Sequence, residues 1–107
     1  MPTFDDRERG EEAKYVRADE LRFKTEARRN RLLGQWAAAE LGLTGSAADD
    51  YVAEVVAADF AEVGDEDVFR KIAGDFRAKN IRMSDDVIRH KMAECLTRAR
   101  TELGVTG

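Results

Sequence analysis

The chain has 107 residues, of which 43% are hydrophobic and 37% are charged, and its formal net charge is −4. This length suits one domain with a modest core, and the apolar share is too high for a wholly disordered chain. A single cysteine excludes an intramolecular disulfide, and no apolar run approaches the roughly 20 residues that a membrane-spanning helix needs. Composition therefore predicts a cytoplasmic protein without membrane insertion.

The charges fall into three blocks along the chain. Residues 1–31 carry nine basic and eight acidic side chains, residues 32–69 carry nine acidic ones and no Lys or Arg, and residues 70–107 carry nine basic and five acidic ones. An acidic middle between basic segments indicates either complementary packing between helices or a docking face for a basic partner. A third interpretation is that these are solvated faces without any partner.

The first segment, residues 1–18, is an arm that is rich in charge and poor in apolar side chains. Between Asp5 and Lys14 the only apolar side chain is Ala13, so this stretch offers a core nothing to bury. Opposite charges nevertheless stand four residues apart, as in Asp5 and Arg9, which is the spacing of stabilising pairs on a helix. Because a helix without packing is marginal in water, we expect a partly ordered helical arm that becomes fully ordered on a partner.

Helical spacing of apolar residues predicts four helices in residues 19–107. The first ends near Gly42 and Gly45, and the second begins at Ser46 as its N-cap, has two acidic residues in its first turn and stops at Gly64. Their apolar positions are Leu32, Leu33, Trp36, Ala37, Leu41 and Leu43, followed by Val52, Val55, Val56, Phe60 and Val63.

The third helix is predicted to run from its N-cap Asp65 to near Asn80, and the fourth from its N-cap Ser84 to Gly104. Four helices with short connections predict an all-α fold, a small four-helix bundle that carries a charged, partly ordered N-terminal helical arm. The predicted core contains Leu33, Trp36, Val56, Phe60, Phe69, Ile72, Ile88, Met92 and Leu96.

No residue pattern indicates an enzyme. His90 is the only histidine, and Cys95 falls on the apolar stripe of the fourth helix, so we interpret them as a surface side chain and a buried structural thiol. No His or Cys cluster has metal-ligand spacing, and the glycines do not form a phosphate-binding loop. We therefore expect no catalytic residue, no metal and no cofactor.

Two features of the first helix have rival interpretations. Trp36 is either a core residue or an anchor for a partner, and its place beside Leu32 and Leu33 favours the core. The basic cluster at residues 28–31 has the composition of a phosphate-binding helix. The acidic total and the lack of a DNA-binding motif favour a cluster that covers the acidic surface of residues 32–69 or an acidic face of a partner, so we predict no binding of nucleic acid.

Several short motifs follow one another from Phe4 to about Leu96. They are Phe4-Asp5-Asp6-Arg7-Glu8, Asp19-Glu20-Leu21-Arg22-Phe23-Lys24, Ala27-Arg28-Arg29-Asn30-Arg31-Leu32-Leu33-Gly34-Gln35-Trp36-Ala37-Ala38, Tyr51-Val52, Val55-Val56, Asp59-Phe60, Gly64-Asp65-Glu66-Asp67-Val68 and Ile88-Arg89-His90-Lys91-Met92-Ala93-Glu94. In their order and spacing they closely resemble the zeta subunit family of alphaproteobacteria, whose members inhibit the F-type ATP synthase.

The resemblance implies that the arm is the inhibitory part and the bundle is its support. In that family the N-terminal segment enters the catalytic head near an alpha–beta catalytic interface and the central rotor shaft, where it blocks rotation driven by ATP hydrolysis. Carried onto this sequence, the candidate inhibitory residues are Phe4, Asp5, Asp6, Arg7, Glu8, Glu11, Glu12, Lys14, Tyr15 and Val16. Gly10 departs from the larger residue expected there, and a mid-helix Gly costs about 1 kcal/mol relative to Ala, which predicts weaker inhibition.

The resemblance further implies that a monomer binds the alpha, beta and central rotor subunits of the ATP synthase, at the cytoplasmic face of the membrane. The alternative function is a helical adaptor or regulator that binds a basic partner through its acidic face, residues 32–69. Deleting the arm distinguishes the two functions, because it removes inhibition of the ATPase but spares binding through the acidic face.

Overall fold

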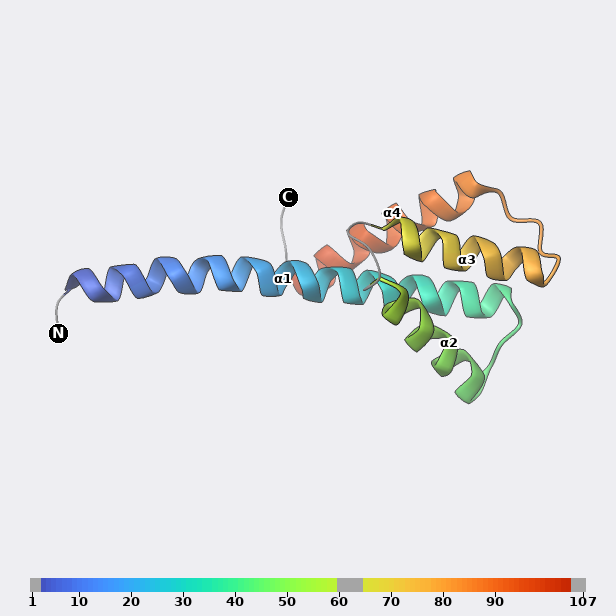
Figure 1. Ribbon diagram of the computed structural model, residues 1–107, viewed down its shortest axis with the longest axis horizontal. Helices are drawn as coiled ribbons and strands as arrows, with labels where there is room; N and C mark the ends of the chain where they lie inside the picture. The colour runs from blue at the N-terminus through green and yellow to red at the C-terminus, as the bar shows by residue number, and fades with distance from the viewer. Residues whose placement is uncertain (1–2, 60–64, 105–107) are drawn as a thin grey trace.

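A computed structural model describes the backbone of residues 3–59 and 65–104 and the side chains of residues 20–59 and 65–104. Within those residues the chain forms four helices and no strand: α1 (Thr3–Glu40), α2 (Gly45–Ala58), α3 (Glu66–Ala78) and α4 (Asp85–Leu103). The predicted all-α fold is confirmed. In Figure 1, α1 is one continuous helix whose C-terminal half packs with the other three helices, while its N-terminal half extends beyond them.

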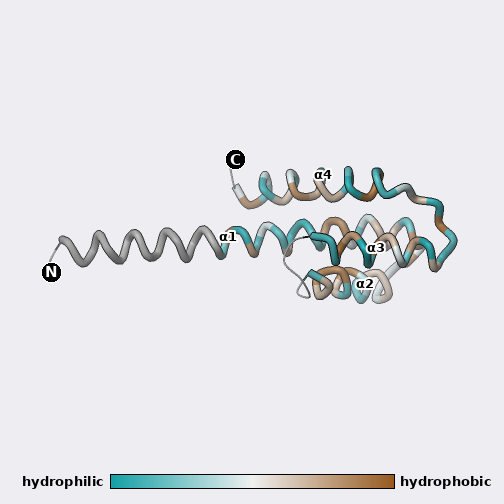
Figure 2. Tube along the Cα trace, turned by 45° about the horizontal axis from the view of Figure 1, so that its top comes forward, coloured by the Kyte–Doolittle hydropathy of each residue, from teal (hydrophilic) through white to brown (hydrophobic). Residues whose placement is uncertain are grey.

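The core lies where α1 packs against α2 and α4, with α3 contacting α2 and α4. Figure 2 shows hydrophobic stretches of α1, α2 and α3 lying together in the bundle, while the part of α1 that enters the bundle is mainly hydrophilic. The largest side chains with almost no exposed surface are Phe76, Leu33, Ile72, Ile88, Val55, Val68 and Asn30.

Most of the predicted core residues are confirmed. Leu33, Ile72, Ile88 and Met92 are buried, and Trp36 and Phe69 are partly buried against the core. The ring of Trp36 meets that of Phe76 edge to face, with centroids 5.6 Å apart and planes at 86°, which places Trp36 in the packing as predicted.

Two predicted core residues are less buried than expected. Val56 and Leu96 are only half-buried, and Phe60 lies outside the described residues. In α2 the buried positions are Tyr51 and Val55, because the helix is turned by about one residue from the face that the Val pattern suggested.

The predicted start of the second helix is wrong. α2 begins at Gly45, its N-cap is Thr44 and no side chain caps it, so Ser46 lies inside the first turn and no acidic residue falls in that turn. Gly42 and Gly45 have φ of 78° and 59°, left-handed values that glycine adopts without strain. These two glycines shape the connection, and they allow the helix to begin one residue before the serine.

The other described helix ends agree better with those predicted from the sequence. Asp65 is the N-cap residue of α3, although its side chain makes no capping hydrogen bond. Ser84 caps α4, its hydroxyl accepting a hydrogen bond from the Val87 amide at 3.2 Å. Gly104 ends α4 with a left-handed φ of 71°, as glycine C-caps commonly do. The predicted stop at Gly64 lies outside the described residues.

Candidate inhibitory arm and its root

The ten candidate inhibitory residues, at positions 4–16, lie on about the first four turns of α1. Their backbone is helical, and their side chains lie outside those that the structure describes. Positions 4, 8, 11 and 15 are spaced by four, three and four residues, so these positions share one side of the helix. The structure thus places the candidates on one projecting helical segment, and their contacts with a partner stay a prediction.

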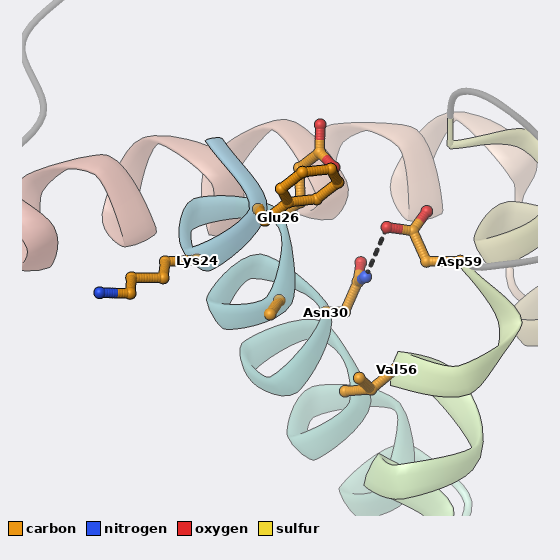
Figure 3. A pocket seen from close by; sticks show the side chains of 7 residues that line it. Lys24, Glu26, Asn30, Val56 and Asp59 are labelled. Carbon is orange, nitrogen blue, oxygen red and sulfur yellow. Dashed lines mark hydrogen bonds between the residues drawn. The ribbon is translucent and has the colours of Figure 1, made fainter. Parts of the chain in front are cut away.

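We call residues 20–31 the root of the arm, because here α1 passes from the arm into the bundle. A cluster of three polar side chains fixes the root to the C-terminal end of α2. The Asn30 amide donates to the Asp59 carboxylate at 3.0 Å, the Arg29 guanidinium donates to the Asn30 oxygen at 3.0 Å, and Arg29 pairs with Asp59 at 3.7 Å. Arg29 and Asn30 are 6% and 1% exposed. Figure 3 shows Asn30 and Asp59 reaching toward one another between the two helices.

A second, exposed pair fixes the root to the C-terminal end of α4. The Arg28 guanidinium donates to the Glu102 carboxylate at 2.5 Å, and Arg98 donates to the same carboxylate at 3.2 Å. The hydrogen bond from Arg28 holds the pKa of Glu102 below its ordinary value, and the same bond raises the pKa of Arg28. The root is therefore attached on two sides, to α2 and to α4.

A groove lies beside these contacts, between α1 and α2. Its volume is about 350 Å³, and its lining is mostly apolar. The residues that line it are Phe23, Lys24, Glu26, Ala27, Asn30, Val56 and Asp59. Phe23 is 61% exposed, more than any other large hydrophobic side chain that the structure describes. In Figure 3, Val56 lies between the two helices, while Lys24 extends away from α2.

The charge blocks pair with one another within the chain, which supports complementary packing between helices. The acidic block pairs with its basic neighbours through Arg29 and Asp59, through Lys71 and Glu54 at 3.6 Å, and through Arg89 and Glu66 at 2.6 Å. Arg28, Arg29 and Asn30 of the basic cluster are thus engaged within the chain. Arg29 pairs with Asp59 of the acidic block as predicted, whereas Arg28 pairs with Glu102, which lies outside that block.

The polar groups in the rest of the bundle have structural roles. The Tyr51 hydroxyl donates to the Asp75 carboxylate at 2.8 Å, and burial together with this bond raises the pKa of Tyr51. Cys95 is buried, which raises the pKa of its thiol, and His90 is exposed, both as predicted. Among the residues described, no three His, Cys, Asp or Glu side chains gather where they could hold a metal ion.

Sequence reasoning missed the polar cluster and the groove at the root. Two local signals pointed to them: Asn30 stands two residues before the apolar pair Leu32 and Leu33, and Phe23 is a large apolar residue in a hydrophilic stretch. In the described part of the chain, no helix has both the length and the apolar character needed to cross a membrane.

Comparison with known proteins identifies the family. The family model described as ATPase inhibitor subunit zeta matches residues 1–102, from the arm into α4. A protein whose structure was solved by NMR in solution is 44% identical and superposes with a TM-score of 0.70, over 78% of this chain and 95% of that one. None of the curated proteins gives a significant match. Because the family match takes in the arm as well as the bundle, this chain belongs to the ATPase inhibitor subunit zeta family.

Proposed function

We propose that this protein inhibits ATP hydrolysis by the F-type ATP synthase through insertion of the arm at an alpha–beta catalytic interface, close to the central rotor shaft. Membership of the family makes the protein an inhibitor of the ATPase, and hence a regulator and not an enzyme. The site of insertion and the subunits contacted are the parts that we propose. The protein acts as a monomer at the cytoplasmic face of the membrane-bound enzyme.

The observation that carries the proposal is the projection of α1 beyond the bundle. Residues 3–22 span about 30 Å at 1.5 Å per residue, and a helix with its side chains is about 10–12 Å wide. The two shorter dimensions of the molecule are 28 and 24 Å. An opening that admits one helix therefore excludes the bundle, so the bundle limits how far the arm enters.

The composition of the arm suits a site between subunits and a rotor. The proposed apolar anchors are Phe4, Tyr15 and Val16, and positions 4 and 15 lie on the same side of α1, where one partner surface can contact both. The charged candidates Asp5, Asp6 and Arg7 occupy the neighbouring positions, where they provide polar contacts. A helix held at both a stationary interface and the shaft blocks rotation by steric obstruction, which requires no catalytic group.

Deletion of residues 1–18 tests this function. Steady-state ATP hydrolysis by the cognate catalytic head is titrated with the full-length protein, with the truncated protein and with a protein whose residues 1–18 are shuffled at constant composition. We expect inhibition by the full-length protein alone. The truncated protein should keep its helical circular dichroism and cooperative melting, because every described core residue lies after position 31.

The shuffled arm controls for length and charge. Equal inhibition by the shuffled protein would mean that bulk and charge suffice, and that the candidate residues have no specific role. Undiminished inhibition by the truncated protein would move the functional site into the bundle. That result would favour the alternative, an adaptor that acts through its acidic face.

A further inference from the structure

We propose that the groove at the root of the arm is a second docking surface for the same partner. It receives one apolar side chain that the catalytic head presents at the rim of the opening through which the arm enters. This inference rests on the proposed function, and it extends the inhibitory contact from the arm onto the bundle.

The first observation is the exposure of Phe23. This side chain is 61% exposed, compared with 46% for Val87 and 38% for Leu103, the other exposed large hydrophobic side chains in the described residues. A phenyl ring in water is unfavourable by roughly 25 cal/mol per Å² of apolar surface, and rings of this kind commonly anchor interfaces. Phe23 stands beside a hollow instead of on a flat surface, which allows a partner side chain to be enclosed.

The second observation is that the groove is formed before any partner binds. Its floor includes Asn30 and Asp59, whose side chains are already joined at 3.0 Å and are held by Arg29. These polar groups are therefore satisfied and require nothing from a ligand. Lys24 and Glu26 also line the groove, but its exposed lining is mostly apolar, with Ala27 contributed by α1 and Val56 by α2. An aliphatic or aromatic side chain therefore suits it better than a charged group.

The third observation is the continuity of α1 between the arm and the groove. Position 16, the last candidate inhibitory position, is seven residues before Phe23, which is two turns and about 10 Å along the same side of the helix. When position 16 contacts the head, Phe23 therefore stands within about 10 Å of that contact and faces the rim. Since the bundle is too wide to follow the arm, its surface next to the root is the part that meets the rim.

Replacement of Phe23 in the full-length protein tests the proposal. We compare Phe23→Ala with Val87→Ala, which removes a comparably exposed apolar side chain from α4. Phe23→Ala should raise the concentration needed for half-maximal inhibition of ATP hydrolysis about tenfold, the usual size of an interface anchor. Inhibition at saturation should stay complete, because the arm is intact. Val87→Ala should match the wild type, and both variants should melt as the wild type does.

These outcomes separate the two proposals. If the wild-type protein inhibits and Phe23→Ala inhibits at the same concentration, the groove is not a docking surface and the proposed function stands. If both variants lose potency equally, the effect is not specific to the groove, and the inference is wrong. If the wild-type protein does not inhibit, both proposals fall.

A photo-crosslinking residue identifies the occupant. Phe23→p-benzoylphenylalanine should crosslink to the alpha or beta subunit when the protein is bound to the head, whereas the same substitution at Val87 should not. Crosslinking of position 23 to a second copy of this chain would show that the groove is a self-association site. Absence of any crosslink from position 23 in the inhibited complex would likewise overturn the proposal.

Discussion

The two halves of α1 form one helix with different sources of stability. In the first half, the stretch from Asp5 to Lys14 has Ala13 as its only apolar residue. In the second half, Leu33 and Ala37 have no exposed surface and pack in the core. Starting a helix is unfavourable, whereas extending one adds a hydrogen bond for each residue fixed. The bundle therefore stabilises the first turns of the helix, and the arm extends the helix from there.

This difference suits the proposed roles of the two halves, in which the arm enters the catalytic head and the root holds the arm to the bundle. We expect a helix that is stabilised mainly near the bundle to keep conformational freedom at its far end, which would help it enter a narrow interface. The root must instead hold firmly, because any force on the arm is transmitted there. Accordingly, Arg29 and Asn30 bind the Asp59 carboxylate inside the protein and so hold α1 to the end of α2.

Hydrogen exchange should give the largest contrast between the two halves. The sequence of residues 5–14 offers only Ala13 as an apolar side chain for packing, so their amides should exchange rapidly in the free protein, since local opening needs little free energy. Amides in the middle of α2 and α4 should be slower by about 1,000-fold or more, because they open only with most of the bundle. Equal protection in both regions would show that the arm is already folded on the bundle. Binding to the catalytic head should protect the arm.

A substitution at the root should have the next largest effect, which is a loss in the free energy of unfolding. Arg29→Met keeps the buried stem but removes the guanidinium, which leaves the Asp59 carboxylate with Asn30 alone. Breaking a largely buried ion pair should lower the free energy of unfolding by about 2–3 kcal/mol, measured by urea denaturation. Arg28→Met is the matched control, because the pair of Arg28 with Glu102 is exposed and screened by water. The control should leave the denaturation midpoint nearly unchanged, and equal effects would contradict a special role for the buried cluster.

Two glycines should respond oppositely to one substitution. A Cβ at Gly34 would lie 3.1 Å from the Cα of Val52, so Gly34→Ala pushes α1 and α2 apart. Overpacking of this kind should outweigh the gain in helix propensity and lower the free energy of unfolding by about 1–2 kcal/mol. A Cβ at Gly74 meets no atom within 4 Å, so Gly74→Ala should raise that free energy by about 0.5–1 kcal/mol. Thermal melting of both variants checks the signs, and stabilisation by Gly34→Ala would mean that the helices can separate at no cost.

The parts of the fold that local chemistry decides were predictable from the sequence. Helical periodicity, the Ser84 cap and the end of α4 at Gly104 depend on residues a few positions apart, and all three were predicted. The sequence did not predict that Val55, and not Val56, is the fully buried side chain, because both lie on the apolar side of α2. The close approach of Val52 to Gly34 is made between helices, and a single sequence does not reveal it.

The candidate site likewise has parts that the sequence predicted and parts that only the packed helices reveal. The inhibitory positions came from the resemblance to the family, and the family is now established, while the contacts of those side chains stay a prediction. The cluster of Asn30 and Asp59 joins residues 29 positions apart, so it depends on how α1 and α2 pack. The groove beside Phe23 likewise exists only once the two helices are assembled.

The arm itself should respond to a change at Gly10, which is the smallest effect expected and the most specific to function. Position 10 lies inside the helical backbone of α1 and far along the sequence from the packed residues. Gly10→Ala should lower the free energy of ordering the bound helix by up to about 1 kcal/mol, which strengthens inhibition about fivefold. The same substitution should leave the melting of the bundle unchanged, because no described core residue is involved.

Titration of ATP hydrolysis with the wild type and with Gly10→Ala measures this effect, and Gly74→Ala serves as a control that changes a helical glycine outside the arm. Gly74→Ala should inhibit as the wild type does, since the stability of the bundle does not limit the bound state. Weaker inhibition by Gly10→Ala would mean that the bound arm bends at position 10 or that a partner backbone approaches it too closely for a methyl group. In that case the bound arm requires glycine at position 10 for its backbone conformation or for a close contact, and the continuous helix of the free protein is not the form that binds.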